Sequence, residues 1–189
     1  MKNEEWDMRI ATDSFIMKDG TQAILRSPES NDADKMLDFL RRTSVESDFL
    51  IRYPEEITMT EENERVFLSN MAESENEFML NAVLGDKVIG NVSISRIAAM
   101  QKIRHRASLG IAVRKTFWNQ GIGKELLQRA ITQAAANGFL QVELGVYENN
   151  QPARSLYRKA GFQEVGRMPR AFLMKDGTFI DEIQMVKFL

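Results

Sequence analysis

Two apolar runs flank an Asp-Gly pair near each end of the chain. Residues 14–27 read SFIMKDGTQAILRS and residues 171–188 read AFLMKDGTFIDEIQMVKF, so the pentapeptide MKDGT occurs in both. Asp-Gly between such runs is typical of a β-hairpin, because a type I′ turn needs positive φ angles. The pattern predicts a hairpin in each region, closed by the same turn chemistry. Nothing else recurs between the two, so we expect no internal repeat.

Two helices are expected between these hairpins. Residues 31–44 (NDADKMLDFLRRTS) place apolar side chains after an Asn- and Asp-rich start. Residues 58–74 (TMTEENERVFLSNMAES) contain Thr60 followed by Asn63 and Glu64, which resembles a helix cap. The side chains predicted to form the apolar face of this second helix are Val66, Phe67, Leu68 and Met71.

Strands and two further helices follow. Residues 77–97 read as two strands joined at Gly85-Asp86, and residues 104–113 (RHRASLGIAV) as a third. A helix is predicted from about Gly121 to Asn137, because apolar residues recur there every four positions and Asn137-Gly138 is a good stop. Residues 139–147 are a strand, and residues 149–162 a short helix with Pro152 in its first turn. This order predicts a mixed α/β or α+β fold around one sheet, with residues 1–189 as a single domain.

Composition narrows the class of protein. Among 189 residues, 43% are hydrophobic and 28% charged, which is ordinary for a soluble globular protein. The net charge of -2 gives no support for nucleic-acid binding. The absence of cysteine excludes disulfides, zinc-thiolate sites and thiol nucleophiles. The acidic start MKNEEWDMRI is not a secretory signal, and no apolar run approaches the ~20 residues of a membrane span. We therefore expect a cytoplasmic protein.

The stretch FWNQGIGKELL, residues 117–127, places Gly121 and Gly123 at the start of the third predicted helix. A helix start offers unpaired N–H groups and positive potential, and glycine lets a phosphate approach closely. The stretch is therefore either a tight turn alone or a phosphate cradle. A dinucleotide fingerprint fails because Leu126 replaces its third glycine, and a Walker loop fails at Trp118 and Glu125.

A longer pattern resembles the acyl-CoA-binding core of the GCN5-related N-acetyltransferase (GNAT) family. The segment GIAVRKTFWNQGIGKELL is followed by VYENNQPARSLYRKAGF. Gly121 and Gly123 match the family's [QR]-x-x-G-x-[GA], with Trp118 where Arg or Gln is usual. The residues that match N-x-x-A-x-x-L-Y-x-x-x-G-F are Asn150, Ala153, Leu156, Tyr157, Gly161 and Phe162. The resemblance covers residues 83–189 and implies a mixed, mostly antiparallel sheet flanked by about four helices.

The resemblance also implies a cofactor site for acetyl-CoA. Ile111, Ala112 and Val113 would pair with the pantetheine arm by strand addition. The residues that would hold the pyrophosphate are Asn119, Gln120, Gly121, Gly123 and Lys124. Asn150, followed by Ala153 in the same motif, would bond the cofactor arm, and its other reading is a helix N-cap.

Within that frame Tyr157 would be the general acid that protonates the leaving thiolate. The general base is open. Residues 104–113 contain no carboxylate, so Glu143 on the next strand and His105, the only histidine, are the candidates, with a water relay as the alternative. The acidic segment 49–63 is either a wall of the acceptor site or a solvated loop. No metal is implied.

These patterns predict an N-acetyltransferase that moves the acetyl group of acetyl-CoA to a primary amine directly, in a ternary complex. The acceptor is a small molecule or a peptide and is not readable from the sequence. The alternatives are a CoA-binding regulatory module without catalysis and a nucleotide-binding domain that uses the same glycine turn. Exposed edges from the two terminal hairpins also favour a homodimer.

Overall fold

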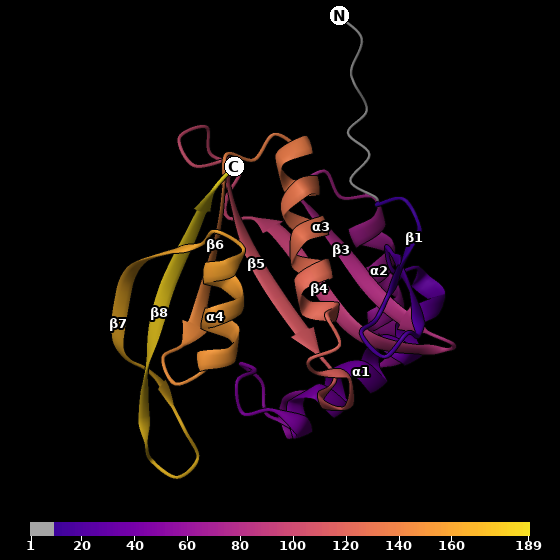
Figure 1. Ribbon diagram of the computed structural model, residues 1–189, viewed down its shortest axis with the longest axis horizontal. Coiled ribbons are helices and arrows are strands. Elements are labelled where there is room, and N and C mark those ends of the chain that lie inside the picture. Colours follow the sequence, from indigo (N-terminus) through magenta and orange to yellow (C-terminus); the bar gives the residue numbers. More distant parts are fainter. Residues whose placement is uncertain (1–9) are drawn as a thin grey trace, which may run out of the picture.

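The computed structural model describes residues 10–189 of the chain (Figure 1). Between these residues, eight strands form one sheet in the order β1-β2-β3-β4-β5-β6-β8-β7. Every neighbouring pair is antiparallel except β5 and β6, which are parallel. The strands are β1 (Asp13–Ile16), β2 (Gln22–Arg26), β3 (Glu77–Leu84), β4 (Lys87–Arg96), β5 (Arg106–Val113), β6 (Gln141–Tyr147), β7 (Gln163–Leu173) and β8 (Phe179–Phe188).

Four α-helices cover the two faces of this sheet in the described part of the chain. They are α1 (Ala33–Glu46), α2 (Glu61–Ala72), α3 (Ile122–Ala136) and α4 (Gln151–Lys159). Figure 1 views the sheet with α3 and α4 on the near side. Side chains of α3 and α4 share one core cluster with all the central strands, whereas α1 and α2 pack in a second cluster with Met79, Val88 and Ala112. The predicted element order and the mixed, mostly antiparallel sheet are confirmed.

The two MKDGT hairpins form as predicted, but their turn type differs. Only Gly20 in the first turn and Gly177 in the second have positive φ, at 86° and 85°. The Gly20 N–H donates to the Met17 carbonyl, and the Gly177 N–H to the Met174 carbonyl. In the opposite direction, the Met17 N–H donates to the Thr21 carbonyl and the Met174 N–H to the Thr178 carbonyl. This is a type I turn followed by a left-handed glycine, so the type I′ prediction is wrong. The shared turn chemistry is confirmed.

The second predicted helix has the expected cap but a different buried face. The Thr60 hydroxyl accepts a bond from the Asn63 N–H at 3.3 Å, and Leu68 and Met71 are buried. Val66 and Phe67 are 51% and 38% exposed, and Glu64 is buried in their place. Glu64, Leu68 and Met71 are spaced so that they lie on one face of α2, which packs toward α1. Val66 and Phe67 lie outside this face.

The terminal hairpins supply both outer strands of the sheet, β1 and β7. The expected exposed edges are therefore present at both ends. No helix in residues 10–189 is long and apolar enough to cross a membrane. The expectation that the chain does not start with a secretory signal concerns its first nine residues, which lie outside the described part.

Candidate active site

The parallel strands β5 and β6 pair only at their beginnings. The register runs from Arg106 opposite Gln141 to Ser108 opposite Glu143 and then stops, although both strands continue. Figure 1 shows the two arrows diverging toward their carboxyl ends. From Leu109 to Val113, β5 is therefore paired with β4 alone. Its other edge is open beside a gap in the middle of the sheet.

This open edge contains Ile111, Ala112 and Val113, all half-buried. Backbone groups along an unpaired strand edge can accept an extended, amide-bearing chain as an additional strand. Trp118 has a structural role at the end of this edge, since its indole N–H donates to the Val113 carbonyl at 2.7 Å. The placement is the one that strand addition requires, and pairing with a cofactor arm stays a prediction.

The glycine turn lies directly after this strand and opens α3. Gly121 is the N-cap with φ 94°, and Asn119 has φ 65°. The first helical bond runs from the Glu125 N–H to the Gly121 carbonyl. Within residues 10–189, no acceptor pairs with the backbone N–H groups of residues 119–124. Consecutive free amides at a helix start, with the helix dipole behind them, suit an anion. Pyrophosphate binding by this turn stays a prediction.

The side chains of the turn divide into anchoring and free groups. Gln120 ties the turn to the first hairpin, because its Oε1 accepts from the Asp19 N–H at 3.1 Å and its carbonyl from the Lys18 N–H at 3.2 Å. Glu125 is engaged by Arg129 at 2.9 Å. No carboxylate of the described chain pairs with Lys124, so its charge adds to the positive potential of the turn. The side-chain oxygen of Gln120 thus supports the site structurally.

Helix α4 begins on the other side of the gap. The Asn150 Oδ1 accepts from the Ala153 N–H at 3.2 Å, which confirms the N-cap reading of this residue. The side-chain NH₂ of Asn150 is a separate group, so a bond to a cofactor arm is compatible with capping and stays a prediction. Pro152 lies in the first turn as expected.

Tyr157 lies on the buried face of α4. It is 7% exposed, and its ring lies 5.8 Å from that of Phe162. Burial raises the pKa of the Tyr157 phenol to about 12, so the hydroxyl stays protonated at neutral pH. A protonated phenol can donate to a developing thiolate, and the acid role stays a prediction.

Neither residue that the sequence predicts as the general base is well placed to accept a proton from the acceptor amine. Glu143 accepts two bonds from Arg106, at 2.5 and 2.7 Å, and the side-chain bond from Arg106 lowers its pKa. A lowered pKa weakens a carboxylate as a proton acceptor. His105 precedes β5, at the end where β5 and β6 are still paired, and its carbonyl accepts from the Leu140 N–H. The structure does not bring His105 to the open part of the gap.

Sequence reasoning missed one carboxylate beside the gap, Glu182 on β8. Glu182 lies opposite Tyr147 in the register, and its side chain lies over Gly145. Strand alternation was the available signal, because Ile183 and Met185 are buried and their neighbours therefore face the other side of the sheet.

The acidic segment 49–63 reaches the same side of the gap. Phe49 contacts the Tyr147 ring edge-on at 5.8 Å, and Tyr147 stacks on Phe172 at 3.7 Å. Glu55 is held by Lys175, whose ammonium lowers the pKa of that carboxyl. The aromatic contact supports the acceptor-wall interpretation, whereas the engaged Glu55 is not free to attract a cationic amine.

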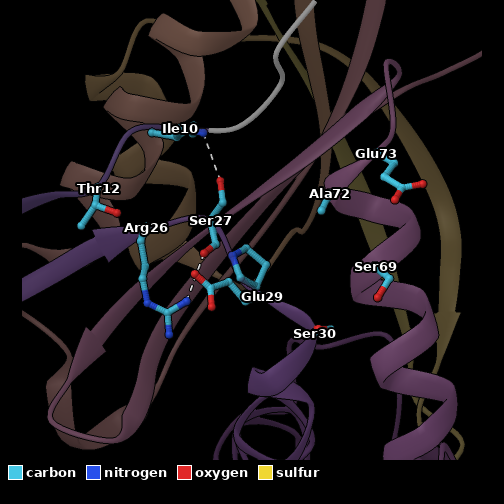
Figure 2. A pocket seen from close by; sticks show the side chains of 10 residues that line it. Ile10, Thr12, Arg26, Ser27, Glu29, Ser30, Ser69, Ala72 and Glu73 are labelled. Carbon is cyan, nitrogen blue, oxygen red and sulfur yellow. Dashed lines mark hydrogen bonds between the residues drawn. The ribbon is translucent and has the colours of Figure 1, made fainter.

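A separate cavity of about 430 Å³ lies between the end of β2, the segment that precedes α1 and the end of α2 (Figure 2). Arg26, on its wall, forms a two-bond ion pair with Asp32 at 2.6 and 2.7 Å. None of the predicted site residues lines this cavity. In residues 10–189, no group of three or more His, Asp or Glu side chains is placed to hold a metal ion.

Comparison with known proteins gives consistent results. A model of the acetyltransferase (GNAT) family matches residues 42–162. The crystal structure of an acetyltransferase of the GNAT family from Streptococcus pneumoniae superposes with a TM-score of 0.84 at 36% identity, covering 88% of this chain and 99% of that one. A putative acetyltransferase from Salmonella typhimurium, solved with acetyl-CoA, has a TM-score of 0.77 at 18% identity, covering 89% and 95%. The L-amino acid N-acetyltransferase AaaT of Escherichia coli is 27% identical over 57% of this chain, and the matched part covers 66% of that relative's length.

Proposed function

Because the chain belongs to the acetyltransferase (GNAT) family, we propose that it transfers the acetyl group of acetyl-CoA to a primary amine. The observation that carries the proposal is the pair of features at the centre of the sheet. A turn with free amides at residues 119–124 lies directly after a strand, β5, whose edge is open. A pyrophosphate next to an amide-bearing arm is the ligand that fits both at once.

The roles of the chain follow from this placement. The amides of the turn and Lys124 hold the pyrophosphate, and the edge from Ile111 to Val113 aligns the pantetheine arm. The thioester then lies in the gap between β5 and β6. The neutral acceptor nitrogen attacks the carbonyl carbon, and the C–S bond breaks. The Tyr157 hydroxyl protonates the thiolate, and the proton that the nitrogen loses replaces the one that Tyr157 gives. With no cysteine in the chain, transfer does not pass through a thiol-bound acyl group.

We propose that the acceptor enters from the α1 side, past the aromatic contact of Phe49 with Tyr147. Similarity to an L-amino acid N-acetyltransferase supports α-amines as the first acceptors to test. A CoA-binding module without catalysis is the alternative. It would share the cofactor contacts and lack turnover.

Two measurements test the proposal. Thermal unfolding with acetyl-CoA, CoA, ATP and NAD comes first. A ligand at about 100 times its Kd adds about 2.7 kcal/mol, a rise in Tm of about 5–11 °C for a chain of this size. Stabilisation by acetyl-CoA and CoA alone is expected, and no shift with either contradicts a CoA site. Release of CoA thiol is then followed with L-amino acids, an alanine-initiated peptide and a lysine-containing peptide. CoA binding without release on any acceptor would favour the non-catalytic module.

A further inference from the structure

Two glycines, one on each strand, follow the point where the sheet opens. The last paired positions of β5 and β6 are Ser108 and Glu143, so two residues further along lie Gly110 and Gly145, both exposed. Neither places a side chain over the gap. Ala112 belongs to the same face as Gly110, and it packs against the α1–α2 cluster. On the α1 side, opposite the face covered by α3, these two positions therefore contribute no side chain of their own to the gap.

The carboxylate of Glu182 occupies the space above Gly145. A Cβ built at position 145 would lie 2.5 Å from the Glu182 Cδ and closer still to its Oε1. No real side chain tolerates such an approach. The glycine is thus the residue that lets this carboxylate lie against β6 at the edge of the gap.

Within residues 10–189, Glu182 lacks a cation partner, and so does the exposed Asp48 on the loop after α1, whereas three neighbouring carboxylates are paired. Glu143 pairs with Arg106, Glu55 with Lys175, and Asp181 with Arg167. Across residues 10–189, no lysine or arginine pairs with Glu182, and no donor bonds its side chain. Glu182 is nevertheless half-buried, beside the stacked rings of Tyr147 and Phe172. A partly buried carboxylate without a cation partner attracts a cation more strongly than one fully exposed to water.

We propose that Glu182 binds the ammonium of the acceptor and takes its proton before attack. The inference rests on the proposed acetyl transfer. The ammonium gives one proton to the Glu182 carboxylate, and the neutral nitrogen forms the N–C bond. The C–S bond breaks as the nitrogen loses a second proton. One of the two protons ends on the CoA sulfur through Tyr157 and the other passes from Glu182 to water.

The groups that face this carboxylate do not replace it. Tyr147 lies opposite on β6, and burial is the first cause that raises its pKa, with smaller contributions from Tyr53, Asp48 and Glu182. A phenol with a raised pKa is not a base at neutral pH. Gln184, opposite Gly145, is neutral. The charged pair of Arg106 with Glu143 lies where the strands are still joined.

The test compares Glu182→Gln and Glu182→Asp with wild type on the acceptor that is turned over fastest among the L-amino acids and the two peptides. At about pH 7 we expect kcat/KM to fall at least about 10²-fold in Glu182→Gln, with partial recovery in Glu182→Asp. The deficit should shrink as the pH approaches the pKa of the acceptor amine, because the amine then arrives neutral. A purely structural role would not produce this convergence. The Kd for CoA, measured by calorimetry, should stay within about twofold.

Three further variants sharpen the result. Gly145→Ala should reproduce the kcat/KM loss by displacing the carboxylate without changing the charge. Asp86→Asn, exposed in the β3–β4 turn, removes a negative charge elsewhere and should behave as wild type. If Glu143→Gln shows the pH-dependent loss and Glu182→Gln does not, the base is Glu143 and the proposal is wrong. Failure of wild type to turn over any acceptor overturns the proposed function and this inference with it. Normal turnover by Glu182→Gln overturns the inference alone.

Discussion

Replacing Gly121 by alanine should damage cofactor binding through the backbone alone. Gly121 has φ 94°, and a Cβ built there meets no atom within 4 Å. The cost is therefore conformational rather than steric, about 1–2 kcal/mol for an L-residue held in the left-handed region. For a domain of this length that corresponds to a fall in Tm of about 2–8 °C. Gly177 has φ 85° and equally open surroundings in the β7–β8 turn, so Gly177→Ala should cost about the same.

The two variants should differ in their affinity for CoA. If the chain relaxes at position 121, the neighbouring amides turn away from the pyrophosphate. A hydrogen bond to a charged group contributes about 1.5–3 kcal/mol, so one lost bond weakens Kd by about 10- to 150-fold. Calorimetric titration of CoA should show this loss in Gly121→Ala and an unchanged Kd in Gly177→Ala. Equal affinities in the two variants, with equal falls in Tm, would show that the turn does not hold the pyrophosphate.

Three other variants test the site and its support. Tyr157→Phe should lower kcat with little change in the KM for acetyl-CoA, and an equal kcat would exclude the acid role. Because burial raises the Tyr157 pKa to about 12, the wild-type rate should show no loss of the acid between about pH 8 and 10. Glu64 is 1% exposed and burial raises its pKa, so its stabilising contribution is complete below its ordinary pKa and lost as the pH rises. Glu64→Gln should therefore raise stability by about 1–3 kcal/mol at about pH 7, a gain that chemical denaturation should show disappearing near pH 4, and a constant difference would contradict the burial argument. In Gly90→Ala the new Cβ would lie 2.9 Å from Ile122 Cγ2 and 3.0 Å from Leu126 Cδ1, so overpacking should cost about 1–3 kcal/mol and move α3, with Tm as the readout.

The features that the sequence predicted well are local ones. The cap at Thr60, the stop after Asn137 and the two MKDGT hairpins each depend on a few neighbouring residues. The predictions were wrong where the geometry depends on a residue outside the short motif. Asp-Gly indicates a turn, but the pair occurs both in a type I′ turn and in a three-residue loop with a single left-handed glycine. On α2, Val66 and Phe67 were predicted to belong to the buried face because they are apolar, whereas the observed buried face includes Glu64.

The same distinction separates the two halves of the candidate site. The proposed anion cradle is local, because it would be built by the backbone of residues 119–124, and a sequence motif can therefore indicate it. The state of each carboxylate is not local. The pKa of Glu143 is lowered by the hydrogen bond from Arg106, which the β5–β6 register places beside it. The β6–β8 register places Glu182 opposite Tyr147, and its side chain lies over Gly145. A base for this reaction has to be sought across strands, where a missing side chain on one strand makes room for a carboxylate from another.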